Sequence, residues 1–309
     1  MNDSSQELQL FNVLNIAKCN DLNCLRGMSS DELQQVHTQS YITGYDQPGY
    51  GYGVFYYGPV VDGKFLIELP DQAFKHGRFY NVPLIVDRDG YEGVIFSNSS
   101  ETTQVQETLD AEILFPDAGC VVCNLALMLG PSFFSRLYEL YPASDYNSTF
   151  FQRQTWFGDF IINCLSPQNR SDGSGPTYQM ATAGVDNNPN SSAVWKMIFD
   201  AGTELHGASG AFLFSNVTGY PEANNLTIAH ILSSYYISFA ITGDPNSMKS
   251  ANAPEWPSYI AGGAGTVGNG ESVGFSVLDF TYTTIEPIPD PDAAPQCDFF
   301  SSRGLAIAN

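Results

Sequence analysis

The sequence predicts an α/β fold in which a mostly parallel sheet is flanked by helices. Two short apolar runs, residues 82–86 (VPLIV) and 194–199 (VWKMIF), have the composition of strands that are covered on both faces. Helical patterns lie between and after these runs, at residues 103–114, 132–141, 149–164 and 225–242. Strands separated by helices in this way are typical of parallel sheets with helices packed against them.

Two helices are expected near the N-terminus. Residues 7–17 have an amphipathic helical pattern. A second helix is predicted to begin near Ser29, because Ser29 or Ser30 can cap its first turn and Glu32 follows within that turn. Residues 44–59 are rich in Gly and Tyr, which is too permissive for a helix, and we expect a loop there.

Residues 225–242 form the most apolar helical pattern of the chain. Asn225 is suited to its N-cap and Gly243 to its C-terminal stop. Because the pattern contains His230 and lacks flanking Lys or Arg, we expect a buried core helix and no transmembrane segment. Residues 275–285 are expected to be rich in β-structure. No repeat or linker divides the chain, so residues 1–309 are expected to form one domain.

The charge of the chain excludes one class of partner. Its 309 residues include 12 Lys and Arg against 33 Asp and Glu, which gives a formal net charge of -21. A surface this acidic repels phosphate backbones, so no nucleic acid is expected to bind. The acidity is better explained by solubility than by a specific cationic partner. The oligomeric state stays open.

Several features favour a secreted protein. Six cysteines are present, and Cys19 and Cys24 are close enough for a local disulfide. The pairing of the other four, Cys120, Cys123, Cys164 and Cys297, stays open, although a local disulfide or two buried thiols suits Cys120 and Cys123 better than a redox pair. N-x-S/T sequons, the candidates for glycosylation, occur at Asn2, Asn98, Asn147, Asn169, Asn190, Asn216 and Asn225. No signal peptide follows Met1, so we expect the true N-terminus to lie upstream.

Metal and cofactor chemistry is not expected. The chain has four histidines, and none of them belongs to an HxxxH or HxH pattern. Cys120 and Cys123 form a single CxxC pair, without the second CxxC pair that would complete a zinc site. The sequence therefore predicts neither a metal site nor a cofactor.

Glu92 and His206 are the candidate reactive residues. Glu92 follows the first predicted strand and a tight Asp-Gly turn, at the end of a parallel strand where such sheets hold reacting groups. An acid there can orient an imidazole, and the alternative is an ordinary solvated loop acid. His206 lies among small residues after the second strand, with the access that a general base needs. Its alternative is a surface loop histidine.

Several short motifs follow one another along the chain. They are Cys19 with Cys24-Leu25-Arg26, GPVVDGKFL at residues 58–66, VPLIV at 82–86 followed by YEGVIF at 91–96, TGDPN at 242–246 with WPSY at 256–259, and CDFF at 297–300. Their order and composition resemble the C-terminal portion of the type-B carboxylesterase/lipase family, which contains fungal lipases and cholinesterases. The resemblance spans nearly the whole chain. It implies an α/β-hydrolase fold whose N-terminal half is absent from this chain.

The resemblance also implies a function. Members of this family hydrolyse carboxylic esters with a Ser-His-Glu triad, so small-molecule or lipid esters are the expected substrates. The resemblance makes Glu92 the triad acid and His206 the triad base. Tyr91 stands where the family commonly has Asp, a position outside the triad. The segment HGASGAFLF after Leu205 matches the family more loosely than the Glu92 segment does.

The nucleophile is not expected within this chain. Residues 270–274 read GESVG, which matches the serine elbow of such hydrolases. Ser272 follows both Glu92 and His206, whereas the α/β-hydrolase order is serine, acid, histidine. No buried strand precedes it and no long helix follows, so Ser272 is interpreted as a decoy. The nucleophile and the oxyanion loop are expected on an upstream segment, and the chain alone is expected to be inactive.

An alternative from another class stays open. A non-catalytic, cholinesterase-like binding protein, or an inactive truncated gene product, would also lack the nucleophile. The retention of both Glu92 and His206 favours the enzyme, because a purely structural chain needs neither.

Overall fold

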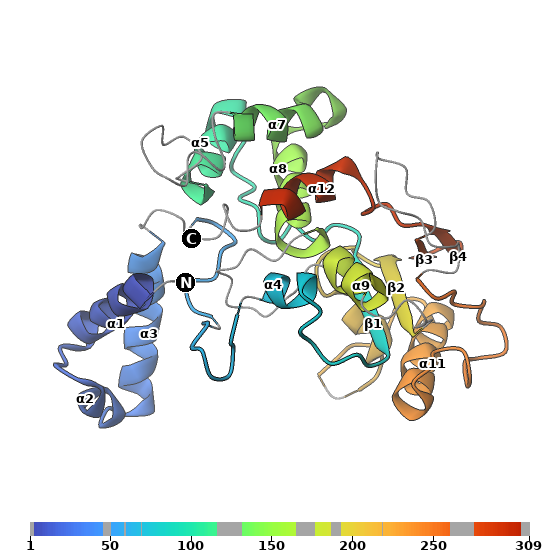
Figure 1. Cartoon of the computed structure of the whole chain (residues 1–309), viewed down its shortest axis with the longest axis horizontal. Helices are drawn as coiled ribbons and strands as arrows, with labels where there is room; N and C mark the ends of the chain where they lie inside the picture. The colour runs from blue at the N-terminus through green and yellow to red at the C-terminus, as the bar shows by residue number, and fades with distance from the viewer. Residues whose placement is uncertain are drawn as a thin grey trace.

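The structure is a computed structural model, and it describes residues 3–45, 51–58, 60–68, 70–115, 132–164, 177–186, 193–217, 219–259 and 275–303. Four strands in this part form one sheet (Figure 1): β1 (Leu84–Asp89), β2 (Val194–Asp200), β3 (Ser276–Thr281) and β4 (Ile285–Pro289). Their order is β1-β2-β3-β4. The first three strands are parallel, and β4 returns antiparallel to β3. The predicted α/β class with a mostly parallel sheet is confirmed.

Strand β1 differs from the strand predicted over residues 82–86. It begins at Leu84 and continues to Asp89, and Val82 before it is 60% exposed. Pairing with β2 runs from Leu84↔Val194 to Asp89↔Phe199. Backbone hydrogen bonds to β2 therefore extend the strand into the polar residues 87–89, which the apolar pattern did not include. Within the described ranges β1 pairs with β2 alone.

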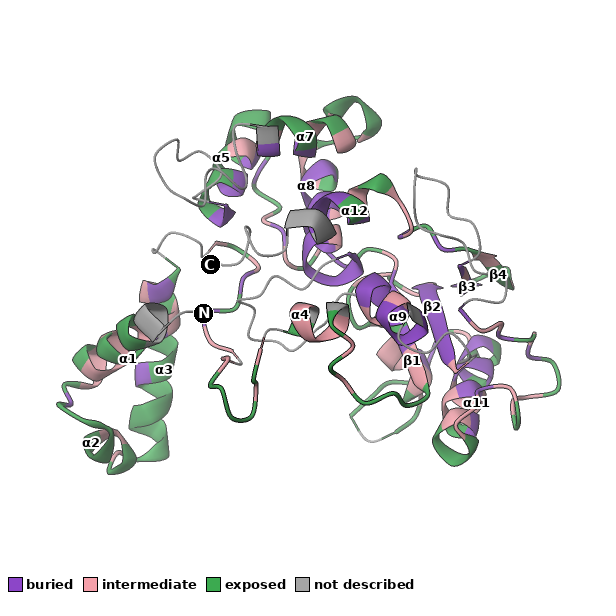
Figure 2. Cartoon of the chain, viewed as in Figure 1, coloured by how far each residue is buried: buried purple, intermediate pink, exposed green. Residues whose placement is uncertain are grey.

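Helices pack on both faces of the sheet. Because side chains alternate along a strand, Trp195, Met197 and Phe199 of β2 share one face, where they join a core with buried residues of helix α11 (Leu226–Thr242). Val194 and Ile198 face the other way and pack with helix α9 (Thr177–Asp186). Figure 2 shows β2 buried along its length. This double covering of β2 is what its apolar run predicts.

Helix α11 is buried on one side only. Asn225 caps it, since its side-chain oxygen accepts hydrogen bonds from the N–H groups of Thr227 and Ile228 at 3.1 and 3.2 Å. Gly243 ends it with a positive φ of 76°. Both predicted ends are confirmed, and the helix joins the core as expected, but on one side only, since Ile241 on the outer side is 65% exposed. No helix among the described residues is long and apolar enough to cross a membrane.

The remaining elements surround this core. In chain order they are α1 (Asp3–Ala17), α2 (Leu22–Arg26), α3 (Ser30–Gly44), α4 (Pro70–Lys75), α5 (Gln104–Leu114), α7 (Ser132–Leu140), η2 (Ala143–Asp145), α8 (Thr149–Gly158), the π-helical η3 (Asp159–Asn163), α10 (Ala208–Leu213) and α12 (Pro295–Arg303). Helices α1, α2 and α3 lie together at one end of the molecule (Figure 1). The predicted cap of α3 is confirmed at Ser29, and the structure adds a capping box in which the Ser29 and Glu32 side chains each accept the other's backbone N–H.

Two disulfides hold separate parts of the fold. Cys19 and Cys24, the pair that the sequence spacing favours, are bonded between α1 and α2. Cys164, at the end of η3, is bonded to Cys297 of α12. This second bond lies in an aromatic core that α7, α8, η3 and α12 build around Trp156. It therefore joins the C-terminal segment to the middle of the chain. Cys120 and Cys123 lie outside the described residues.

A buried ion network joins the sheet to the segment that follows β4. The Lys196 side chain on β2 is 0% exposed, and its Nζ lies 2.7 Å from Asp290 Oδ2 and 2.6 Å from Asp292 Oδ2. Arg88 on β1 donates to both carboxylate oxygens of Asp292, at 2.9 and 2.8 Å. These two cations hold the pKa of Asp292 at about 2, despite burial that opposes its ionisation. The charges are thus paired, as buried charges require.

Candidate active site

The two candidate residues lie on adjacent loops at one edge of the sheet. Glu92 lies on the acid loop (residues 90–97), which follows β1, and His206 lies on the base loop (residues 201–207), which follows β2. Because β1 and β2 are parallel neighbours, both loops leave the sheet at its carboxyl edge. The loops also pair directly, since Tyr91 N–H donates to the Glu204 carbonyl at 2.7 Å.

Glu92 and His206 are hydrogen-bonded. His206 Nδ1 lies 2.5 Å from Glu92 Oε2, and the side chains are 43% and 3% exposed. The other carboxylate oxygen, Oε1, accepts the backbone N–H of Asp89 at 2.7 Å. A proton on Nδ1 satisfies the contact with Glu92, and in that tautomer the unprotonated Nε2 can act as a base. The buried acid and the accessible imidazole thus have the arrangement of a catalytic acid–base pair.

Close backbone packing holds the acid loop against helix α8. A Cβ atom on Gly93 would lie 1.8 Å from the carbonyl oxygen of Gln154, and one on Gly158 would lie 2.9 Å from the Gly93 nitrogen. Only glycine at both positions allows this approach. The Ser97 hydroxyl also donates to the Gly93 carbonyl at 2.8 Å. The residue after Glu92 is therefore held by both a steric fit and a hydrogen bond.

The base loop ends in a left-handed turn that starts helix α10. Gly207 has a φ of 88°, a conformation that favours glycine. The Asp89 carboxylate accepts the N–H of Gly207 at 2.7 Å and that of Ser209 at 2.9 Å. The Phe96 ring meets the His206 imidazole edge-on, with centroids 5.1 Å apart. The imidazole is thus fixed by Glu92, by its own backbone and by an aromatic neighbour.

The carboxyl edge of the sheet is strongly acidic. Asp89 is 4% exposed, and its burial together with the negative charge of Glu92 raises its pKa to about 6. Burial also raises the pKa of Asp87 on β1, which the Glu92 charge raises further. Glu92 and Asp89 thus place two carboxylates next to His206, one at its side chain and one at the following backbone N–H of Gly207.

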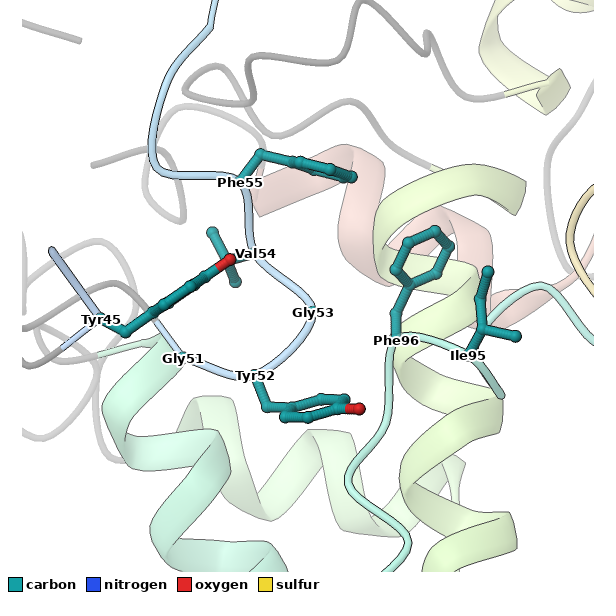
Figure 3. A pocket seen from close by; sticks show the side chains of 8 residues that line it. All are labelled: Tyr45, Gly51, Tyr52, Gly53, Val54, Phe55, Ile95 and Phe96. Atoms are coloured by element: carbon teal, nitrogen blue, oxygen red, sulfur yellow. The ribbon is translucent and has the colours of Figure 1, made fainter. Parts of the chain in front are cut away.

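An apolar pocket is lined by Phe96, the residue whose ring contacts His206. Its volume is about 460 Å³, and its walls are Tyr45, Gly51, Tyr52, Gly53, Val54, Phe55, Ile95 and Phe96 (Figure 3). The pocket volume is within the range typical of small-molecule sites. A Cβ atom on Gly53, whose φ is 87°, would lie 2.1 Å from the Phe96 carbonyl oxygen. The two walls of the pocket, residues 51–55 and residues 95–96, therefore touch through their backbones.

Sequence reasoning missed two features of this site. The Gly- and Tyr-rich stretch was predicted as a loop, and residues 51–58 do lack helix and strand, but their role in the pocket was not foreseen. Asp89 was also missed. An acid at the end of a predicted strand, three residues before Glu92, was the available signal.

The other predicted site residues are the glycosylation candidates and Ser272, and the structure describes some of them. Asn147 and Asn216 are exposed, whereas Asn98 and Asn225 are half-buried, with side-chain oxygens that accept nearby backbone N–H groups. Asn2, Asn169, Asn190 and Ser272 lie outside the described residues. In the part of the chain that the structure describes, no group of three or more His, Cys, Asp or Glu side chains is arranged to hold a metal ion.

Known proteins resemble this chain in sequence and fold. It is 27% identical to secreted lipase 4 of Gibberella zeae over 77% of this chain and 40% of that protein, and 24% identical to the para-nitrobenzyl esterase of Bacillus subtilis over 81% and 44%. It thus spans less than half of either relative. The crystal structure of Aspergillus niger EstA matches with a TM-score of 0.72 at 20% identity, over 99% of this chain and 56% of that one, which confirms the α/β-hydrolase-type fold.

The family expected from the sequence motifs is confirmed by a second comparison. Residues 3–268 match the carboxylesterase family, and that range includes Glu92, His206 and both walls of the pocket. The match extends over most of the 309 residues. This chain is a member of the carboxylesterase family.

Proposed function

We propose that the protein to which this chain belongs hydrolyses carboxylic esters through a Ser-His-Glu triad, with Glu92 as the acid and His206 as the base. The observation that carries the proposal is the 2.5 Å hydrogen bond between a buried carboxylate and an accessible imidazole at the carboxyl edge of the sheet. Family membership supports the same chemistry.

The proposed mechanism uses these two residues as follows. His206 Nε2 takes the proton of the serine hydroxyl as its oxygen attacks the ester carbonyl, and then gives that proton to the leaving alcohol. Water hydrolyses the acyl-enzyme by the same route, with His206 again as base. Glu92 stays ionised, keeps the Nδ1 proton in place and stabilises the imidazolium.

The nucleophile is proposed to lie on a segment that precedes Glu92 in the full protein. This follows the α/β-hydrolase order of serine, acid and histidine, and no G-x-S-x-G motif occurs before Glu92 in this sequence. Ser272 of the GESVG segment remains a proposed decoy for the same reason. Residues 1–309 are then the C-terminal part of one hydrolase domain and have no esterase activity alone.

The pocket supports an ester with an apolar group. Aromatic and aliphatic side chains dominate its walls, and Phe96 both lines it and contacts the His206 imidazole. The named activities of the two relatives, a lipase and an esterase for an aromatic ester, agree with such a substrate. We propose a secreted protein, on the basis of the disulfides and the secreted relative, with Asn147 and Asn216 as the glycosylation sites that are exposed among the described residues.

The test is hydrolysis of a short p-nitrophenyl ester by the protein expressed from its complete coding sequence. The variant His206→Ala is expected to lower kcat at least about a thousand-fold, and Glu92→Gln about a hundred-fold or more. The control His76→Ala is matched, because His76 also lies beside a glutamate, Glu68, at 3.4 Å, but away from the pocket. Full activity of His206→Ala would reject the assignment of His206 as the base, whereas a complete unmodified protein without activity would favour a non-catalytic binding protein.

A further inference from the structure

We propose that Asp89 is a positioning residue that ties Glu92 and His206 together. Its backbone N–H donates to the Glu92 side chain. Its carboxylate accepts the N–H groups of Gly207 and Ser209, which lie directly after His206 at the start of α10. This inference deepens the proposed function, on which its catalytic meaning rests.

The geometry gives the two halves of Asp89 different tasks. The backbone N–H donates to Glu92 Oε1 at 2.7 Å, which leaves Oε2 directed at the imidazole. The carboxylate uses one oxygen for each of two amides, Gly207 N–H at 2.7 Å and Ser209 N–H at 2.9 Å. Hydrogen bonds from amides to a carboxylate are stronger than neutral ones. One residue therefore sets the position of both members of the pair.

The base loop needs such an anchor. Gly207 is left-handed, with a φ of 88°, and Glu204 has a φ of 58°, which is strained for a residue with a Cβ. Helix α10 has no side-chain cap from its own N-cap residue, Gly207. The Asp89 carboxylate supplies this function from the end of strand β1, 120 positions away from Ser209 in sequence. Without the Asp89 carboxylate, the N–H groups of Gly207 and Ser209 would lose the oxygens that accept their hydrogen bonds, and the His206 imidazole would lose its fixed direction.

The test compares Asp89→Asn with the unmodified protein, each expressed from its complete coding sequence, by two readouts. An asparagine retains one acceptor oxygen and replaces the other with an NH₂ group, which cannot accept an amide proton. Hydrogen exchange is expected to rise about ten-fold or more in peptides that contain Gly207 and Ser209. In ¹⁵N NMR spectra, the signature of a single Nδ1-protonated tautomer at His206 is expected to give way to a mixture. The chain has only four histidines, and His206→Ala identifies the signal.

The matched control is Asp244→Asn. Asp244 also accepts a backbone N–H, that of Asn246 at 2.9 Å, but it follows α11 and lies outside the site. This control should leave both readouts at residues 203–214 unchanged. If Asp89→Asn fails to fold, the proposal is tested by amide hydrogen exchange in the unmodified protein. Gly207 and Ser209 amides that exchange as fast as unprotected amides would overturn the proposal, as would a folded Asp89→Asn chain with unchanged exchange and tautomer.

These readouts do not depend on esterase activity. If the ester assay of the full protein fails while Asp89→Asn still alters the His206 tautomer, then the proposed function falls and the positioning role remains. If the full protein is active, Asp89→Asn is expected to lower kcat about ten-fold with little change in KM, because the pocket walls do not include Asp89. An unchanged kcat in the active protein would overturn the positioning role.

Discussion

Removal of the disulfide between Cys164 and Cys297 is expected to cost far more stability than removal of the one between Cys19 and Cys24. The first bond joins residues 133 positions apart, and the second joins residues 5 apart. In the chain-entropy relation, closing the longer loop stabilises the fold by roughly 5 kcal/mol at 25 °C, and closing the shorter one by roughly 2 kcal/mol. The predicted difference in free energy of unfolding is therefore about 3 kcal/mol.

Burial makes this difference a lower bound. Cys164 and Cys297 are 0% and 2% exposed, so their replacement also leaves a cavity in the aromatic core, whereas Cys24 is exposed. Alanine is preferred to serine in both double variants, because a serine hydroxyl would be buried at the core pair without a partner. The two variants thus change the same chemistry in loops of very different length.

The assay is urea unfolding followed by tryptophan fluorescence. All three tryptophans are buried and should report loss of the core. Both double variants are compared with the unmodified chain for midpoint and slope. Equal costs for the two disulfides, or a larger cost for the short loop, would refute the reasoning and would show that α12 is held to the body of the molecule mainly by other contacts.

Three further predictions concern single positions. Gly93→Ala is expected to lower the free energy of unfolding by about 1–3 kcal/mol in urea titrations, because the new Cβ would meet the Gln154 carbonyl at 1.8 Å; a cost within error would contradict this. Lys196→Met should cost about 3–5 kcal/mol, since it leaves buried Asp290 without its cation. The raised pKa of Asp89 means that protonation of its carboxyl favours the folded state. Its contribution to the free energy of unfolding is on the order of 3 kcal/mol. This contribution is fully present below the ordinary pKa of 3.8 and is lost as the pH rises through about 6. Unfolding midpoints of Asp89→Asn measured across this range should lack that loss, and parallel pH profiles would refute it.

Local features of the fold were predictable from the sequence because their causes are local. The caps of α3 and α11 depend on side chains within three residues of the backbone groups that they bond. Strand β2 was recognisable because both of its faces are covered, which makes its apolar run continuous. Strand β1 was misplaced because its polar half, from Asp87 to Asp89, is held by pairing with β2, which leaves no apolar pattern.

The short helices were missed for a related reason. Helix α10 has six residues, and its start depends on the Asp89 carboxylate at the end of strand β1. Helix α4 also has six residues, too few for a periodic pattern to stand out. The bond between Cys164 and Cys297 likewise could not be read from the sequence, since the spacing of distant cysteines does not determine their pairing.

By itself the sequence determined the α/β class, the family and the two residues of the candidate pair, because composition, order of motifs and strand-end positions are properties of the chain. Tertiary structure alone decided how these residues meet. Glu92 and His206 are 114 positions apart, and the parallel pairing of β1 with β2 brings their loops together. The roles of Asp89 and of the pocket wall at Tyr52 and Phe96 arise from contacts between distant segments, which no local pattern encodes.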